Sequence, residues 1–366
     1  MALLEYATLT VPDVVKKSVV AFYSADPLMR KVFKKGKVKR SGGTQVRIKR
    51  LKGGHSDVTE INQSNLSVPL VRYPSYGQMT GDWAKYIKPI ILPHLTRDRL
   101  PTPGEKSQWV KEESMAAMLS LQNEVCRQVY IGLGGPASGT TTGPLLGLGT
   151  LNGYRTTGTS SGFENGAIRF ETPAAQETAA VQYLNETRIE DAVNDLDNWY
   201  NHFLDHGGIG TGFLPALEEL KMTADTYAQE GGVDIALMSI ADHVDVAEEV
   251  RSYPGGANQG PAVVYTPDDL DSGKAHQSFH LVNGVQIYAN RWMTDTGIDA
   301  GATTTEHVYA LNSSYVEWWV NAGNDFKVTK FFDGLETGNQ DADIGYIILE
   351  CQFALPSLLV HGGLAN

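Results

Sequence analysis

The sequence predicts an α+β protein, and three observations support this fold class. The chain holds one long helical pattern, several short segments with strand periodicity, and glycine-rich interruptions between them. A helix repeats its apolar residues every three and four positions, whereas a half-buried strand repeats them every two. With 366 residues, 42% of them apolar and 20% charged, the chain can bury a sizeable core as one large domain or two joined ones.

The first 36 residues are expected to form an arm with one short helix. Four apolar residues recur at helical spacing after the turn signal Pro12-Asp13. They are Val14, Val15, Val19 and Phe22. The sequence has no apolar run typical of a signal peptide or a membrane-spanning helix, so we expect the protein to stay in the cytoplasm.

A basic, extended ribbon is expected to follow the arm. Val46 and Ile48 alternate with cations in the predicted strand Thr44–Leu51, which is the period of a strand with one solvated face. The tip is placed at Lys52–Asp57, and the polar return segment Val58–Gln78 carries two prolines, which are typical of edge strands. Such a ribbon has too little apolar surface to be stable alone and is expected to lie on another surface.

The distribution of charge is the most distinctive feature of the sequence. The formal net charge is −12, yet residues 1–111 carry 20 Lys and Arg against 8 Asp and Glu, while residues 112–366 carry 10 against 34. Eleven basic residues and no acidic one lie between Arg30 and Lys52. Because a basic arm and an acidic body attract each other, the ribbon is predicted to contact a neighbouring subunit. The candidate contact residues are Lys39, Arg40, Arg47, Lys49, Arg50 and Lys52.

Two other interpretations of the basic run stay open. Sequence-specific nucleic-acid binding is disfavoured because a chain of net charge −12 repels a duplex from most of its surface. Lysine and arginine can also protect an exposed strand from unwanted pairing, which is common in soluble proteins.

The longest helical pattern runs from about Glu105 to Leu133, after an extended segment over residues 82–103. At 1.5 Å per residue this helix is roughly 40 Å long. Glycines end it, and the stretch Gly134–Gly166 is expected to be a surface loop because it lacks large apolar residues. The residues assigned to one apolar face are Trp109, Met115, Met118, Leu119, Gln122, Cys126, Val129 and Tyr130.

The second half of the chain alternates between helical and strand patterns. A helix over Thr187–His206 is predicted from a capping box of Thr187 and Glu190. The dipeptide Asn283-Gly284 between apolar residues predicts a tight hairpin. The other expected elements are a helix from Pro215 to Gly231-Gly232, a strand at Val233–Ser239, a helix at Ala241–Tyr253, and strands at Val308–Leu311, Phe326–Phe332 and Ile344–Ala354.

No motif in the sequence predicts a catalytic, cofactor or metal site. His202 and His206 are four positions apart, as in a zinc-protease helix, but Phe203 replaces the glutamate that acts as general base. The glycines of Gly134–Thr141 have phosphate-loop spacing, but Thr140 stands where the lysine is required. We therefore expect a protein that is not an enzyme and needs no cofactor.

Two further pairs of residues carry groups that could take part in chemistry. Ser239 and His243 are one helical turn apart without the Gly-x-Ser-x-Gly elbow, so a hydrolase is only a formal alternative. Cys126 and Cys351 are the only cysteines, and each lies in an apolar run, so two buried thiols in a reducing compartment are expected.

The order of these elements resembles the major capsid protein of tailed bacteriophages, whose fold is shared with encapsulin shells. The segments that carry the resemblance are Lys37–Tyr76 as the extended loop, Glu105–Leu133 as the spine helix, Thr187 to about Met293 as the axial domain, and Tyr346–Gly362 as the return into the peripheral domain. The resemblance covers nearly the whole chain.

The resemblance implies a structural subunit that assembles as pentamers and hexamers into an icosahedral head around double-stranded DNA. It also implies a separate scaffolding protein and a portal as partners, no membrane, no cofactor, and a location in the virion after assembly in the host cytoplasm. An encapsulin-like compartment and a tail or surface structural protein are the alternatives. The implied divisions are an arm (1–36), an extended loop with a following strand (37–103), a spine helix with peripheral domain (104–186), an axial domain (187–320) and return strands (321–366).

Overall fold

The computed structural model divides the chain into two compact units, which are described separately. The first unit comprises residues 1–46, 82–145 and 318–353, and the second comprises residues 47–81, 146–317 and 354–366. The residues whose structure is described are 3–24, 26–51, 76–100, 102–131, 145, 147–148, 182–183, 186–187, 202–205, 212–252, 279–293, 308–334 and 341–365. Both helices and strands occur in each unit, which confirms the predicted α+β class.

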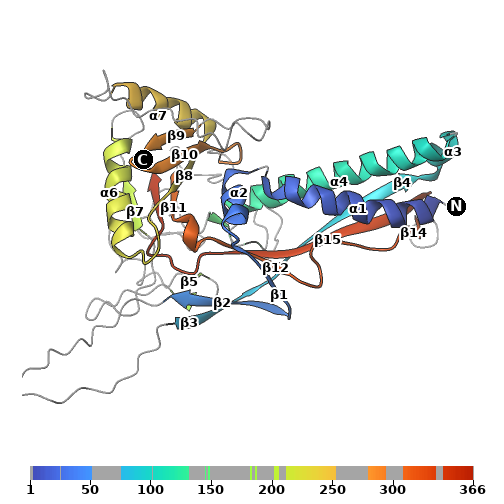
Figure 1. Cartoon of the computed structure of the whole chain (residues 1–366), viewed down its shortest axis with the longest axis horizontal. Coiled ribbons are helices and arrows are strands. Elements are labelled where there is room, and N and C mark those ends of the chain that lie inside the picture. The colour runs from blue at the N-terminus through green and yellow to red at the C-terminus, as the bar shows by residue number, and fades with distance from the viewer. Residues whose placement is uncertain are drawn as a thin grey trace, which may run out of the picture. The chain divides into compact units, whose positions relative to one another are not determined.

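The first unit is organised by its longest strand, β15 (Ala342–Ala354), as Figure 1 shows. β15 pairs antiparallel with β4 (Ala84–Pro93), in a register that runs from Ala342 opposite Pro93 to Cys351 opposite Ala84. Four shorter strands complete this sheet. They are β1 (Val38–Ser41), β12 (Glu317–Asn321), β13 (Lys327–Val328) and β14 (Phe332–Asp333).

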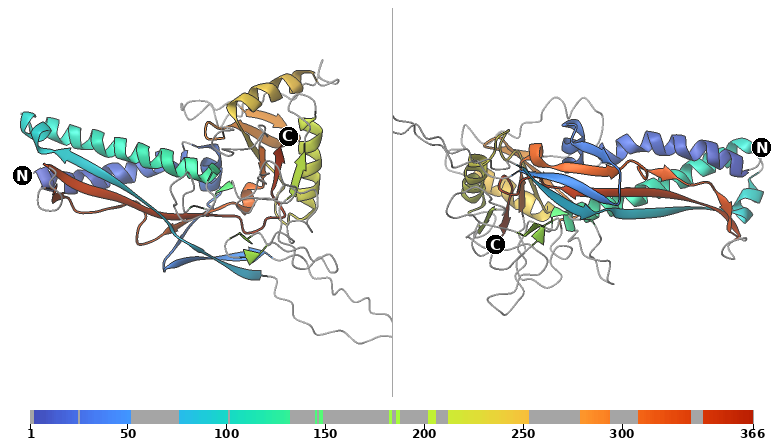
Figure 2. Two further views of the ribbon diagram at one scale, coloured as in Figure 1. Left: turned by 180° about the vertical axis from the view of Figure 1, so that it is seen from behind. Right: turned by 90° about the horizontal axis from the view of Figure 1, so that it is seen from below.

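Helices run along the ribbon that β4 and β15 form, as both views of Figure 2 show. The helix α4 packs on β4, and α1 packs on α4. α4 closely matches the long helix that the sequence predicts from about Glu105 to Leu133. The four helices of this unit are α1 (Leu3–Ser24), α2 (Pro27–Lys34), α3 (His94–Arg99) and α4 (Pro103–Ile131).

The amino-terminal arm is more helical than the sequence predicts. One short helix was expected, but α1 has 22 residues, passes through Pro12, and is followed by α2. Val11, Val15 and Phe22 are each at most 2% exposed, and burial of such a side chain contributes about 1.5–3 kcal/mol. This burial offsets the roughly 3 kcal/mol that a proline costs inside a helix.

The buried face of α4 matches the predicted face only in part. The predicted residues that are buried are Met118, Cys126, Val129 and Tyr130. Met115 and Leu119 were assigned to the apolar face, but their side chains are 52% and 58% exposed. The buried face also includes Val110 and Ser114. Ser114 can be buried because its hydroxyl donates to the carbonyl oxygen of Val110 at 2.6 Å, which satisfies the polar group within the helix.

Asp26 and Tyr130 connect α2 to the end of α4. Asp26 is the N-cap of α2, where its Oδ2 accepts from the amides of Leu28 and Met29 at 3.1 and 3.2 Å. The hydroxyl of Tyr130 lies 2.7 Å from both carboxylate oxygens of Asp26, to which it donates. Both side chains are buried, so the carboxylate depends on these donors to offset the loss of solvation.

The second unit contains a six-stranded sheet in the order β7-β16-β11-β8-β10-β9. α6 (Phe213–Thr226) and α7 (Ile240–Ser252) contribute apolar side chains to its core, among them Leu217, Leu220 and Val246. The strands are β7 (His202–Asp205), β8 (Ile235–Met238), β9 (Phe279–Val282), β10 (Val285–Ala289), β11 (Val308–Leu311) and β16 (Gly362–Ala365).

Local sequence signals correctly predicted several elements of this unit. The predicted strand and helix after Val233 are β8 and α7, and β11 has the predicted bounds. The hairpin between β9 and β10 turns at Asn283 and Gly284, whose φ angles are 48° and 83°. Both values lie in the left-handed region that a primed two-residue turn requires.

The predicted helix over Thr187–His206 is wrong at both ends. Thr187 belongs to β6 (Glu186–Thr187), which pairs with β5 (Gln182–Tyr183), and residues 202–205 form β7. β7 pairs parallel with β16, so hydrogen bonds to a distant segment override the local capping signal. Residues 188–201 lie outside the described part of the chain.

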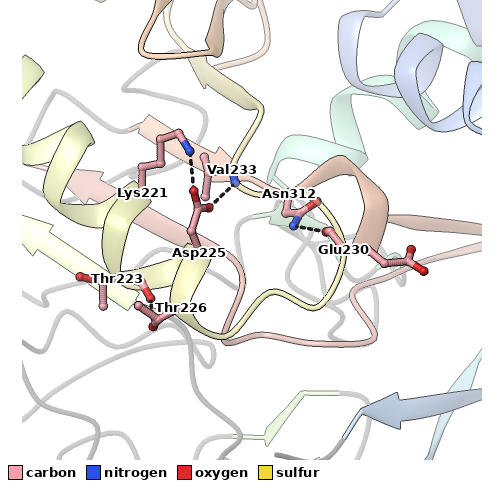
Figure 3. Close-up of polar contacts among 7 residues, drawn as sticks. All are labelled: Lys221, Thr223, Asp225, Thr226, Glu230, Val233 and Asn312. Carbon is pink, nitrogen blue, oxygen red and sulfur yellow. Dashed lines mark hydrogen bonds and ion pairs between the residues drawn. The ribbon is translucent and has the colours of Figure 1, made fainter.

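The connection from α6 to β8 is held by polar contacts, which Figure 3 shows. Asp225 accepts from the Lys221 ammonium and from the amide of Val233, the latter at 2.7 Å. α6 ends at Thr226, before the Gly231-Gly232 pair at which its end was predicted. Gly232 is needed for a different reason, since a Cβ there would lie 2.4 Å from an Asp225 carboxylate oxygen.

Both cysteines are buried free thiols. Cys126 lies on α4 and Cys351 on β15, and neither forms a disulfide. Burial raises the pKa of the Cys351 thiol well above its ordinary value, because the thiolate is poorly solvated in the core. Two buried thiols agree with the expectation from the sequence.

Replacing Tyr130 with phenylalanine is expected to destabilise the first unit by about 1–3 kcal/mol, because buried Asp26 loses a hydrogen-bond donor. Urea denaturation followed by circular dichroism measures this change. Gln108→Ala on the same helix removes the exposed hydrogen bond to Glu112 and should change the free energy of unfolding by less than about 0.5 kcal/mol. Equal stability of Tyr130→Phe and wild type would contradict the proposed role of the Asp26 contact.

Candidate assembly surface

A two-stranded ribbon carries three of the eleven basic residues between Arg30 and Lys52, namely Arg47, Lys49 and Arg50. It consists of β2 (Gln45–Leu51) and β3 (Tyr76–Asp82), which pair only with each other among the described strands. Residues 52–75, which include the predicted tip, lie outside the described part of the chain. β2 begins within one residue of the predicted strand, and Figure 1 shows β2 beside β3.

The alternation along β2 gives the ribbon two different faces. Val46 and Ile48 are buried, whereas Arg47 and Lys49 are exposed. Arg50 is only 3% exposed, although its charge and its place in the basic run predicted a solvated position. The correction follows from the strict period of two, which puts position 50 on the same face as Val46 and Ile48.

Two of the predicted contact residues lie on β1, in the six-stranded sheet of the first unit. The Arg40 guanidinium contacts Asp325 Oδ2 through Nε at 2.8 Å and through Nη2 at 2.7 Å. The ammonium of Lys39 lies 5.2 Å from the centre of the Trp319 ring, a cation–π contact. Both contacts are within one chain and join β1 to the β12–β13 region, where β1 pairs parallel with β12.

The six predicted residues therefore do not form one surface. Lys39 and Arg40 lie on β1, Arg47 and Lys49 lie on the exposed face of β2, and Arg50 is buried. Lys52 lies outside the described residues. Because the Arg40 side chain is 69% exposed, its ion pair with Asp325 contributes at most about 1 kcal/mol to stability. Arg47 and Lys49 are thus the described members of the set that are exposed on the ribbon.

An exposed apolar face on β4 was not predicted from the sequence. Ile87 is 51% and Ile91 42% exposed, and Pro89 and Pro93 are exposed on the same side of the strand. The opposite side of β4 includes buried residues such as Ile90. The alternation of isoleucine and proline over residues 87–93 is the signal that could have identified this strand, because prolines within sheets occur mainly on edge strands.

Ser239 and His243, the possible catalytic pair, have structural roles at the start of α7. The Ser239 hydroxyl oxygen accepts from the amide of Asp242 at 3.1 Å, which makes it a cap at the start of α7. The amide of His243 donates to the Ser239 carbonyl at 3.1 Å, as in the first turn of a helix. The described residues thus give no geometric support to the hydrolase alternative.

Of the residues that the sequence offers for metal and phosphate binding, the described part of the chain includes His202. His202 lies on strand β7 rather than on a helix, and burial lowers its pKa to about 4. His206 and the glycine-rich Gly134–Thr141 stretch lie outside the described residues. Within the described residues, no group of three or more His, Cys, Asp or Glu side chains is placed to hold a metal ion.

Comparison with protein-family models and with curated protein sequences finds no match. Among solved structures, the chain is similar to the capsid of an empty GTA particle, with 8% identity, a TM-score of 0.49, and 91% of this chain and 95% of that chain covered. It is similar to the SrpI encapsulin of Synechococcus elongatus, with 10% identity, a TM-score of 0.47, and coverage of 93% and 88%. It is similar to a chain of Mycobacterium phage Adephagia, with 14% identity, a TM-score of 0.46, and coverage of 91% and 89%.

None of the helices in the described ranges is both long and apolar enough to cross a membrane.

Charge reversal at adjacent positions of β2 is expected to have very different effects on stability. Arg50→Glu should lower the free energy of unfolding by at least about 2 kcal/mol, because it places a carboxylate at a buried position. Lys49→Glu should change it by less than about 0.5 kcal/mol, because position 49 is exposed. Thermal unfolding of both variants measures the difference. Similar unfolding curves for both variants would contradict the assigned faces of the strand.

Proposed function

We propose that this chain is the structural subunit of a protein shell that forms by self-assembly. The observation that carries the proposal is the two-faced ribbon of β2 and β3. One face of β2 is buried, and the other presents Arg47 and Lys49. A chain with 34 acidic residues over positions 112–366 offers many carboxylates to such a face. The ribbon is therefore suited to lie across an acidic surface of another copy.

The strength of such a contact comes from repetition. One exposed ion pair contributes about 0–1 kcal/mol and is weakened by salt. In a closed symmetric assembly every copy makes the same contact. The small free energies of these contacts therefore add up over the whole particle. A shell built in this way assembles cooperatively, and its assembly depends on ionic strength.

The outward face of β4 also supports a subunit that is covered by other copies. Ile87 and Ile91 are exposed on this strand, and the long β4–β15 pairing holds them in a regular row. On α4, Met115 and Leu119 are also exposed, one helical turn apart. Apolar side chains in such numbers on regular elements are typical of surfaces that become buried between proteins.

In its finer form, the proposal is an icosahedral head of pentamers and hexamers that encloses double-stranded DNA, as the resemblance to tailed-phage capsid proteins implies. A scaffolding protein and a portal are the proposed partners, and the virion is the proposed location. The proposed parts are an arm (1–36), an extended loop (37–103), a spine-helix region (104–186), an axial domain (187–320) and return strands (321–366). α4 corresponds to the spine helix in this scheme.

Electron microscopy of the purified protein tests the coarse function directly. Closed particles of uniform size are the expected result, and nucleic acid in particles isolated from the producing cells would favour a genome-enclosing head over an encapsulin-like compartment. Tubes or rings would indicate a tail component. A protein that stays monomeric at all concentrations and ionic strengths would overturn the shell proposal.

The double variant Arg47→Glu/Lys49→Glu should fold normally but fail to assemble, because it reverses the charge of the exposed ribbon face. Sedimentation velocity measures the assembled fraction, and circular dichroism verifies folding. Lys34→Glu/Lys35→Glu is a matched control, since it reverses two exposed cations of the same basic run outside the ribbon. If both double variants lose assembly equally, net charge rather than the ribbon is responsible.

Raising the salt concentration from 50 mM to 500 mM should slow assembly of the wild type, because the Debye length falls from about 14 Å to about 4 Å. Light scattering over a salt series measures the rate. Because charge-driven contacts weaken as salt rises, an assembly rate that is the same across the series would show that apolar contacts alone drive the process.

A further inference from the structure

The backbones of two histidines are hydrogen-bonded where the strand β16 pairs with β7 in the second unit. His202 begins β7, and its amide donates to the carbonyl oxygen of His361 at 3.2 Å. The next residue of the chain, Gly362, is in register with His202. β16 lies between β7 and β11 in the sheet, so the contact is at the start of a strand with a neighbour on each side.

The surroundings of His361 fix the protonation state of its ring. The side chain is fully buried, and its Nδ1 accepts from the amide of Asn312 at 3.2 Å. Its Nε2 lies 3.3 Å from the carbonyl oxygen of Tyr315, to which the Nε2 proton can donate. A backbone amide can only donate, so Nδ1 has to be unprotonated for this arrangement to hold. A second proton would place two N–H groups against each other.

His202 lies in a second environment that disfavours charge. Its ring stacks on Tyr227 with 5.6 Å between the ring centres, and its Nε2 is shielded from solvent. Burial lowers the pKa of His202 to about 4, although a hydrogen bond with the backbone of Leu359 opposes this shift. Burial likewise lowers the pKa of His361 to about 4. Both rings are therefore neutral in the folded unit at pH 7.

From this geometry we infer that His202 and His361 form an acid-sensitive latch on the carboxyl-terminal strand β16. With both rings neutral, β16 stays seated between β7 and β11. Protonation of His361 breaks its contact with the Asn312 amide, and protonation of His202 places a charge on a ring whose Nε2 is shielded from solvent. Mild acid thereby opens the β7–β16 contact before the rest of the molecule unfolds.

The other groups that face the two rings do not remove this effect. Asp234 is the acidic group that raises the pKa of His361, but burial outweighs it. The carboxylate of Asp234 is already engaged, since it accepts from the amide and the hydroxyl of Ser313 at 2.8 and 2.5 Å. α6 faces β16 with apolar atoms, because Leu220 packs against Gly362. Tyr227 and Tyr315 contribute a ring and a neutral carbonyl.

The direction of the pH effect follows from the two states of the strand. When the strand is open, each histidine has its ordinary pKa near 6.5. When β16 is paired with its neighbours, the pKa of each histidine is about 4. Below pH 6.5 the opened strand binds protons that the seated strand excludes, so opening becomes more favourable as the pH falls towards 4. The pKa values of the two states differ by about 2.5. This difference raises the equilibrium constant for opening by up to roughly 300-fold for each histidine.

Hydrogen exchange of the full-length protein between pH 7.5 and pH 4.5, corrected for the intrinsic exchange rate, tests the latch. The carboxyl-terminal peptide that contains β16 should lose protection below about pH 6, while peptides from α4 in the first unit stay protected. The variant His361→Gln/His202→Gln has glutamine side chains that do not take up a proton in this pH range. In this variant the acid-induced loss of protection of the β16 peptide should be at least tenfold smaller. His280→Gln is the matched control, because His280 lies on β9, the strand at the opposite edge of the same sheet.

If the double variant does not fold at pH 7.5, the wild type and His202→Gln still decide the question. NMR titration of the wild type should then show a ring of His361 that stays neutral down to pH 5. A ring that titrates near pH 6.5, or a β16 peptide that keeps its protection to pH 4.5, would overturn the latch. Equal loss of protection in α4 would also overturn it, since acid would then unfold the protein globally. The latch concerns the second unit alone and does not depend on the shell proposal.

Discussion

The pairing of β4 with β15 is the constraint on which the first unit depends. All ten residues of β4 are in register with β15, which gives a ribbon of about 34 Å. Without it, α4, a helix of about 44 Å, would lack the strand it packs on. Gly345 of β15 shows how closely the unit is packed, because a Cβ there would lie 2.8 Å from the ring of Phe331. The same strand also pairs with β12, β13 and β14.

The elements that could be predicted are those with a strong local signal. The Asn283-Gly284 turn follows from the backbone angles that only a few residues adopt readily. α4 and the β8–α7 succession follow from apolar spacing that holds over many residues. In the same way, the period of two over Thr44–Leu51 correctly predicts a strand in which Val46 and Ile48 are buried.

The remaining elements are decided by contacts between segments that are distant in sequence. Residues 202–205 become a strand because β16, more than 150 positions later, supplies their hydrogen-bond partners. Pro12 stays inside α1 because that helix has α4 to pack against. Arg50 shows that charge alone does not predict which residues of the candidate surface are exposed. Its charge indicated an exposed position, whereas its place in the alternation decided that it is buried.

The two cysteines give the molecule a useful chemical property. Cys126 and Cys351 are the whole complement of thiols in the sequence, and both are buried in the fold. A thiolate at Cys351 is further suppressed by its raised pKa, so alkylating reagents react with it slowly. A cysteine introduced on the exposed face of β2 would therefore be the preferred site for a maleimide dye. Single-site fluorescence labelling of this ribbon needs no prior removal of native thiols.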